Sequence, residues 1–250
     1  MQVVTDTLLT QYSRKGKGRI VLLLHGWGDS AAGLASLQDK LSKDFDVIAL
    51  DLPGFGGTAV PKQAWGLSDY AAFIHHFLEK IGAQAVYAII GHSNGGAIAL
   101  RGLGRGDLHA EKVVLLAAAG IRGTYKGRVK ALRIVTKIGK ALTMPLPKPV
   151  KNRLRQGVYK SVGSDMLVAE HLQETFKKVV TDDVRVDAAQ LTQPTLLIYG
   201  ENDKAAPPWY GEAYRQIIPT ASLEILPGAE HFVHLDRPAE VTRAIREFLR

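Results

Sequence analysis

Short runs of apolar residues recur along the chain, separated by longer stretches with helical spacing. The runs of strand length cover residues 20–24, 46–50, 85–90, 113–117, 195–199 and 222–226. Apolar strands without alternation are typical of parallel sheets that are buried on both faces. Between them, apolar side chains recur every three or four residues. This pattern predicts an α/β fold with a mostly parallel central sheet and helices on both faces.

Residues at the ends of these stretches predict where elements begin and stop. The amino-terminal stretch 3–13 is expected to form a hairpin, and helices are expected over 31–43, 207–218 and from Pro238 onward. A further helix is expected to begin with Ser68 as its N-cap and to end at Gly82. Serine caps the first free amides of a helix, and glycine readily ends one.

The alternation of strands and helices stops between residues 120 and 190. This part contains no convincing core strand but has amphipathic stretches over 125–143, 149–162 and 165–180. We interpret it as an all-helical insertion. The predicted organisation is a core made of residues 1–120 and 190–250, with a helical cap, or lid, over residues 121–189.

Composition limits the chemistry. The 250 residues suit one α/β domain, and 46% of them are hydrophobic. The absence of cysteine excludes disulfides, thiolate metal sites and a cysteine nucleophile. The histidines do not have metal-ligand spacing, so no metal is expected. The first residues lack the features of a signal peptide, and we expect a cytoplasmic protein that is a monomer or a dimer.

The net charge of +8 is unevenly spread. Residues 112–164, here called the basic block, contain 13 Lys and Arg and no Asp or Glu, whereas the remainder has 19 basic and 24 acidic residues. Such a block could meet an anionic membrane surface, an acidic carrier protein or an anionic substrate, with nucleic acid disfavoured. A solvated basic face without any partner is an equal alternative.

A strand, a turn and a helix of small residues meet at Ser93. The motif Gly91-His92-Ser93-Asn94-Gly95 has the form of a nucleophile elbow, in which glycines let the strand and helix pass close together. The turn places the serine hydroxyl at a helix N-terminus, where free N–H groups favour developing negative charge. Ser93 is therefore the candidate nucleophile.

Three other loops follow predicted strands and should meet Ser93 at one edge of the sheet. They supply His231 as the base and Asp203 to orient it, in the chain order Ser, Asp, His. The backbone N–H groups of Trp27 and Asn94 would bind the oxyanion. His234 competes with His231, and Asp182 or Asp183 competes with Asp203.

Together these motifs resemble the α/β-hydrolase superfamily with a helical cap. The resemblance covers about 20–119 and 191–250 and rests on five motifs: residues 25–28, 51–56, 91–96 and 200–203, and His231 ahead of 236–238. It implies a hydrolase without a cofactor. Serine at the elbow, where dehalogenase and epoxide hydrolase relatives have aspartate, points to acyl transfer to water. Asn94 departs from the Met, Leu or Gln that is more frequent there, which would make the pocket more polar.

The cap should select the substrate, because an insertion at this point of the chain would cover the site. Its inner face is expected to be apolar, which suits carboxylic esters with short to medium acyl, aryl or lipid-like groups. Hydrolysis of a carbon–carbon bond in a diketone-like substrate and ligand binding without catalysis are the alternatives. His25 and His92 are expected to hydrogen-bond the loops rather than transfer protons. The tentative pocket residues are His25, His92, Val129, Leu132, His171 and Phe232.

Overall fold

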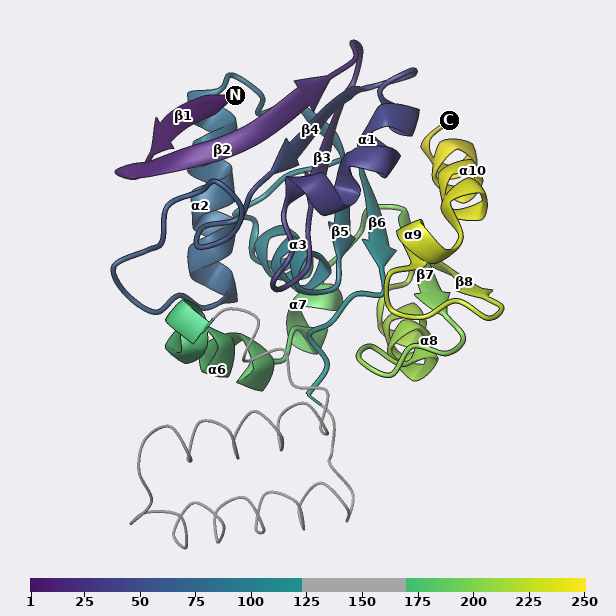
Figure 1. Ribbon diagram of the computed structural model, residues 1–250. Helices are drawn as coiled ribbons and strands as arrows, with labels where there is room; N and C mark the ends of the chain where they lie inside the picture. Colours follow the sequence, from purple (N-terminus) through teal and green to yellow (C-terminus); the bar gives the residue numbers. More distant parts are fainter. Residues whose placement is uncertain (123–169) are drawn as a thin grey trace, which may run out of the picture.

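Eight strands form one sheet at the centre of the molecule (Figure 1). The structure, a computed structural model, describes residues 1–122 and 170–250. The strand order is β1-β2-β4-β3-β5-β6-β7-β8. The bounds are β1 Gln2–Thr5, β2 Leu8–Lys15, β3 Ile20–Leu24, β4 Asp46–Leu50, β5 Val86–His92, β6 Lys112–Leu116, β7 Thr195–Gly200 and β8 Ala221–Leu226.

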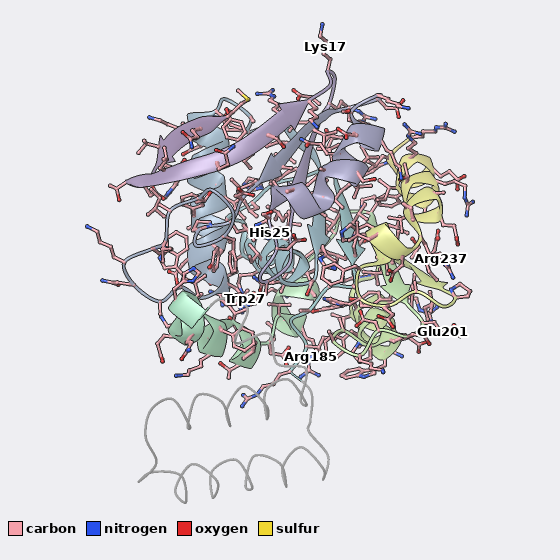
Figure 2. All side chains as sticks on the ribbon, in the orientation of Figure 1. Lys17, His25, Trp27, Arg185, Glu201 and Arg237 are labelled. Atoms are coloured by element: carbon pink, nitrogen blue, oxygen red, sulfur yellow. The ribbon has the colours of Figure 1, made fainter. Side chains whose placement is uncertain are left out.

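The strands β4, β3, β5, β6, β7 and β8, in this order across the sheet, are parallel to one another. Strand β2 runs antiparallel to β4, and β1 runs antiparallel to β2. Their register brings the carboxyl ends of the parallel strands together: Leu24 pairs with Gly91, and Gly200 pairs with Leu226. The loops that follow β3, β5, β7 and β8 therefore start at one edge. Lys17, in the turn before β3, lies at the opposite end of the sheet from Trp27, which follows β3 (Figure 2).

Helices cover both faces of this sheet (Figure 1). One face packs against α1 (Ala35–Leu41) and α10 (Pro238–Leu249) through an apolar cluster that joins them to β3 and β4. The other face packs against α2 (Leu67–Lys80), α3 (Asn94–Arg105), α7 (Arg185–Ala188) and α8 (Pro208–Ile217). The strands can be apolar on both sides because both sides are covered.

Some predicted element ends were wrong. Helix α2 begins at Leu67 rather than after Ser68, because its N-cap is Gly66. The backbone N–H of Gly66 donates to the side chain of Asp69 at 2.7 Å. The stretch 31–43 divides into a 3₁₀ turn, η1 (Ala31–Leu34), followed by α1. A short helix, α9 (Val233–Asp236), follows the histidine loop and was not predicted.

Only part of the predicted cap falls within the described residues. It comprises η3 (Glu170–Leu172), α6 (Gln173–Thr181) and α7, which packs on the core, while the helices expected over 125–143 and 149–162 lie outside. Helix α6 contacts the loop before α2: Thr175 Oγ1 accepts the N–H of Trp65 at 3.1 Å. Division into a core and a cap remains a prediction. In the described ranges, none of the helices combines the length and the apolar character needed to cross a membrane.

Candidate active site

Ser93 sits in a strained turn between β5 and α3. Its φ of +50° and ψ of −113° lie in a region that residues with side chains rarely adopt. The neighbouring glycines make this turn possible. A Cβ on Gly91 would lie 2.6 Å from the backbone nitrogen of Gly96, and one on Gly95 would lie 2.3 Å from the carbonyl oxygen of Leu24. The strand and the helix therefore approach so closely that any side chain at these positions would clash.

The structure brings Ser93, His231 and Asp203 into one chain of hydrogen bonds. Ser93 Oγ lies 2.9 Å from His231 Nε2, and His231 Nδ1 lies 2.7 Å from Asp203 Oδ2. The second Asp203 oxygen accepts the backbone N–H groups of Ala205 and Ala206 at 2.7 and 2.9 Å. The Asp203 side chain has no solvent exposure, so these two amides replace water around its carboxylate. In this arrangement the imidazole of His231 bridges the serine hydroxyl and the carboxylate.

The competing residues are engaged elsewhere. Asp182 pairs with Arg101, and Asp183 pairs with Arg185. His234 packs against the His92 ring, with 4.8 Å between ring centroids, and burial lowers its pKa. Of the candidates for base and acid, the structure places His231 and Asp203 beside Ser93.

The backbone amides of Trp27 and Asn94 have the surroundings that oxyanion donors need. Asn94 is the first residue of α3, so its N–H has no acceptor one turn earlier in the helix. The loop that carries Trp27 lies against the nucleophile, because a Cβ on Gly26 would be 3.2 Å from Ser93 Cβ. Neither amide donates a hydrogen bond to another residue in the described ranges 1–122 and 170–250.

His25 holds this loop in place. Its Nδ1–H donates to the carbonyl of Gly26 at 2.7 Å, and its Nε2 accepts the N–H of Leu52 at 2.9 Å. Burial lowers its pKa, which keeps the ring neutral, as this pair of bonds requires. His25 is fully buried and is not among the described residues that line the cavity at Ser93.

His92 supports the opposite loop. Its Nε2–H donates to the backbone carbonyl of His231 at 3.1 Å, and the two rings have centroids 4.9 Å apart. Burial and the neighbouring histidines, His234 first among them, lower its pKa well below its usual range. His92 therefore remains a neutral donor beside the candidate base, and like His25 it is absent from the described lining of the cavity.

None of the other tentative pocket residues is among the described residues that line the cavity at Ser93. His171 donates from Nε2 to the carbonyl of Gly54 at 2.9 Å and lines a different hollow. Phe232 packs on His92, with 5.1 Å between ring centroids, and is 42% exposed. Val129 and Leu132 fall in the range that is not described. The assignment of these six residues to the pocket therefore gains no support from the described part.

A cavity of about 190 Å³ opens at Ser93 and His231. Most of the described side chains around it are apolar, and the polar ones among them are Ser93, Asn94, Arg122, Asp182, Tyr210 and His231. The sequence interpretation expected an apolar cap face over the site but did not name Phe176 and Val179 of α6, although their spacing on one helix face could have indicated them. The apolar lining residues within the described ranges are Trp27, Ala97, Ala119, Ile121, Phe176, Val179, Val180 and Ala205.

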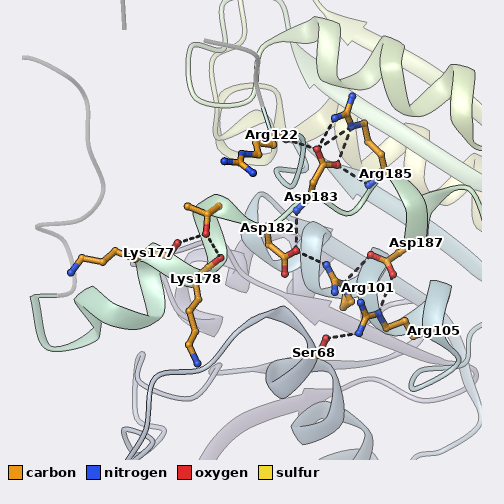
Figure 3. A network of polar contacts seen from close by, with 11 residues as sticks. Ser68, Arg101, Arg105, Arg122, Lys177, Lys178, Asp182, Asp183, Arg185 and Asp187 are labelled. Atoms are coloured by element: carbon orange, nitrogen blue, oxygen red, sulfur yellow. Dashed lines mark hydrogen bonds and ion pairs between the residues drawn. The ribbon is translucent and has the colours of Figure 1, made fainter. Parts of the chain in front are cut away.

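An ion-pair network ties the helix of the nucleophile to α6 and α7 (Figure 3). Arg101 of α3 contacts Asp182 at 2.7 Å and Asp187 at 3.0 Å, and Arg105 contacts Asp187 at 3.2 Å. The Arg101 side chain is only 7% exposed. Because α6 carries one wall of the cavity, this network connects that wall to the backbone of the candidate nucleophile.

Comparison with known proteins identifies the family of this chain. A family model described as alpha/beta hydrolase family matches residues 21–244. The chain belongs to this alpha/beta hydrolase family. The match confirms the predicted family and the α/β fold, and it makes a hydrolytic function the general expectation.

The names of relatives of this alpha/beta hydrolase describe different reactions. The 2-hydroxy-6-oxo-6-(2'-aminophenyl)hexa-2,4-dienoic acid hydrolase of Metapseudomonas resinovorans is 24% identical over 260 residues, covering 96% of this chain and 87% of the relative. The pimeloyl-[acyl-carrier protein] methyl ester esterase of Nitrosospira multiformis is 26% identical over 259 residues, covering 94% and 96%. An uncharacterised protein of Mycobacterium tuberculosis is 26% identical over 262 residues, covering 94% and 76%.

Solved structures agree on the fold. A membrane phospholipase A, described as a bacterial virulence factor, superposes with a TM-score of 0.80 at 23% identity, covering all of this chain and 84% of the other. A meta-cleavage product hydrolase of Pseudomonas fluorescens superposes with a TM-score of 0.76 at 22% identity, covering 99% and 96%. At these identities the likeness concerns the architecture and not the substrate.

Proposed function

We propose that this alpha/beta hydrolase cleaves carboxylic esters through an acyl-enzyme intermediate on Ser93. The observation that supports this most directly is the unbroken hydrogen-bond chain from Ser93 Oγ through His231 to Asp203. A serine hydroxyl is a weak nucleophile unless a base accepts its proton, and His231 lies within reach to do so. This proposal makes Ser93, His231 and Asp203 the catalytic residues.

In the proposed reaction, Ser93 Oγ attacks the ester carbonyl while its proton moves to His231 Nε2. The amides of Trp27 and Asn94 stabilise the oxyanion of the tetrahedral intermediate, each contributing about 2.7–4 kcal/mol to the transition state. His231 then gives its proton to the leaving alcohol, and the acyl-enzyme remains. Water, deprotonated by His231, attacks the acyl-enzyme and releases the acid. Asp203 holds the imidazole in orientation and stabilises its charged form.

The cavity favours small acyl groups. Its volume of about 190 Å³ is below the range of about 300–1,000 Å³ that is typical of pockets for drug-sized ligands. Its mainly apolar wall suits the hydrocarbon part of an ester. Most of the basic block lies outside the described residues, so an acidic carrier protein or an anionic membrane surface as partner stays a prediction.

Hydrolysis of a carbon–carbon bond is the second candidate function. It could use the same three residues, and the names of the relatives from Metapseudomonas resinovorans and Pseudomonas fluorescens favour it. The first of these names describes a substrate that is a carboxylic acid. Arg122, the one Lys or Arg among the described lining residues, could pair with such a carboxylate, because only its backbone N–H contacts Asp183.

A labelling experiment tests the proposed function. A fluorophosphonate probe should label the wild-type protein and should fail to label Ser93→Ala, whereas the exposed-serine control Ser222→Ala should be labelled normally. A folded wild-type protein that resists labelling would favour ligand binding without catalysis. Comparing kcat/KM for p-nitrophenyl esters of increasing acyl length with that for a 2-hydroxy-6-oxo-dienoic acid then separates the two candidate reactions.

A further inference from the structure

We propose that the side chain of Asn94 recognises a neutral hydrogen-bonding group on the acyl part of the substrate. This inference rests on the proposed ester hydrolysis and narrows its substrate class. The preferred esters would carry an ether, hydroxyl or keto oxygen a few bonds from the scissile carbonyl, rather than a plain hydrocarbon chain. Asn94 would then have two roles, with its backbone N–H on the oxyanion and its side chain on the acyl group.

The Asn94 amide is buried without a partner in the described structure. The residue is 3% exposed, and neither Nδ2 nor Oδ1 has a hydrogen-bond partner among residues 1–122 and 170–250. It does not cap its own helix, because Ser93 is the N-cap of α3 and the Asn94 amide has no backbone partner in these ranges. Leaving a buried polar group unsatisfied costs about 1–3 kcal/mol, so such a group in a native fold calls for a bonding partner.

The position of this amide points to a ligand in the cavity. Asn94 lines the cavity at Ser93, and so does Ala97, one helical turn further on the same face of α3. In the proposed mechanism the Asn94 backbone N–H binds the carbonyl oxygen of the acyl group. The side chain of the same residue therefore lies close to the acyl chain rather than to the distant end of the leaving alcohol.

A second unpartnered polar atom borders the same cavity. Trp27 Nε1 is buried and finds no acceptor in the described ranges, while the indole ring packs against Phe55 and Phe176 with centroids 4.9 and 5.1 Å away. Trp27 also lines the cavity. Together, the amide of Asn94 and the indole of Trp27 offer two donors and one acceptor within an apolar wall, which is the arrangement that orients a polar ligand group.

The charges around the cavity favour a neutral group over an ion next to Asn94. The carboxylate of Asp182 is already paired with Arg101 at 2.7 Å. Arg122 is exposed to solvent, where attraction to an anion is screened. Asparagine itself carries no charge and can both donate and accept. A neutral ether, keto or hydroxyl oxygen on the acyl chain accepts a hydrogen bond from Nδ2, and a hydroxyl can also donate to Oδ1, without bringing an uncompensated charge into an apolar cavity.

Two esters of equal shape test the inference. The p-nitrophenyl esters of butanoic and methoxyacetic acid differ by one CH₂ replaced by an ether oxygen. Acyl selectivity is defined as kcat/KM for the methoxyacetyl ester divided by kcat/KM for the butanoyl ester. We expect Asn94→Leu and Asn94→Ala to lower this selectivity about tenfold, as for one lost hydrogen bond, and Asn94→Gln to retain most of it. The different chemical reactivities of the two esters cancel when variants are compared with wild type.

The design separates failure of this inference from failure of the proposed function. Both esters are measured on the same preparation, so partial unfolding of a variant leaves the ratio intact, and Asn94→Ala serves if Asn94→Leu does not fold. Ala97→Val changes the same cavity face without a polar group and should leave the selectivity within about twofold of wild type. If the Asn94 variants turn over the esters with unchanged acyl selectivity, or if Ala97→Val loses as much selectivity as they do, the role of Asn94 is overturned while the proposed ester hydrolysis stands. If neither the esters nor the fluorophosphonate react with wild type, the proposed function falls as well.

Discussion

Arg101 Nη2 donates to Asp182 Oδ1 across 2.7 Å, and this contact joins the helix of the nucleophile to the last turn of α6. Nε of the same guanidinium lies 3.0 Å from Asp187 (Figure 3). Both partners of the second pair are largely buried, with 7% and 10% of their side chains exposed. In such a pair each charge depends on the other, because water cannot replace the lost partner.

Replacing Arg101 by methionine should therefore destabilise the protein strongly. We expect Arg101→Met to lower the free energy of unfolding by about 1.5–3 kcal/mol, because the carboxylate of Asp187 loses its buried cation and retains only the half-exposed Arg105. Urea unfolding measures this change. A rise in KM for ester substrates should accompany it, since the wall formed by α6 loses its anchor on α3.

Arg105 supplies the matched control for this variant. It contacts the same carboxylate at 3.2 Å, but its own side chain is 51% exposed. An exposed ion pair contributes about 0–1 kcal/mol, so Arg105→Met should have a small effect. Equal losses of stability in the two variants would contradict the importance of burial in this network.

His92 should act as a positioning residue for the candidate base. It donates to the backbone carbonyl of His231 at 3.1 Å and does not itself contact Ser93 Oγ in the described structure. Replacement by phenylalanine removes the donor while keeping an aromatic ring. We expect His92→Phe to lower kcat about tenfold with little change in KM, because the loss concerns the orientation of His231 rather than substrate binding.

Steady-state kinetics on an ester substrate measures this split. His92→Gln, which retains a donor, should recover part of the lost kcat. The half-buried His75 on α2 provides a control, and His75→Phe should leave both constants near their wild-type values. A fall in kcat/KM that comes only from KM would argue that His92 shapes the cavity instead.

Three buried histidines should make the fold sensitive to acid. Burial lowers the pKa of His25, His92 and His234 from the ordinary value of 6.5. Above about pH 6.5 these residues are neutral in both the folded and the unfolded chain. As the pH falls below that value, the unfolded chain binds protons that the folded chain excludes, so the free energy of unfolding decreases. The loss continues down to the lowered pKa values of the folded state.

The slope of the free energy of unfolding against pH can be measured, and the share of one histidine can be determined with a variant. Each histidine contributes up to about 1.4 kcal/mol per pH unit, and the three together contribute up to about 4 kcal/mol per pH unit. Urea unfolding between pH 7.5 and 5 should show this decline. His234→Phe should reduce the slope by the share of one histidine, which separates it from the contribution of carboxylates. An unchanged slope would mean that His234 titrates alike in both states.

The residues of the candidate site were predictable because each lies in a loop that follows a strand of the parallel sheet. The strands before Ser93 and Asp203 are buried, whereas β8, before His231, is a partly exposed edge strand. Ser93, Asp203 and His231 are far apart in the sequence, but parallel pairing aligns Leu24 with Gly91 and Gly200 with Leu226. Strand ends recognised from apolar runs therefore converge at one edge without any knowledge of side-chain contacts. That these residues catalyse a reaction remains a prediction until the labelling experiment is done.

Contacts between side chains on different helices were not predictable in the same way. Arg101 and Asp182 are 81 residues apart, and nothing in either local pattern distinguishes this largely buried pair from charges that face the solvent. His25 was a tentative pocket residue because it lies in a strand-end loop, but its ring turns inward to bond Gly26 and Leu52. A sequence position specifies which loop holds a residue, whereas the direction of its side chain depends on partners that only folding brings near.

The close approach of β3 and α3 at the elbow gives a last prediction, about Gly95. A Cβ at this position would lie 2.3 Å from the carbonyl oxygen of Leu24 and 2.7 Å from that of His25, and neither backbone atom can move aside cheaply. Gly95→Ala should lower the free energy of unfolding by about 1–3 kcal/mol, as expected for overpacking, and should slow fluorophosphonate labelling by displacing Ser93. In Gly66→Ala the Cβ would meet only the Asp69 carboxylate at 3.8 Å, so a loss of stability there comes from the N-cap of α2 and not from overpacking, and fluorophosphonate labelling should keep its wild-type rate. Equal stability of Gly95→Ala and wild type in urea would show that strand and helix can separate at the elbow without cost.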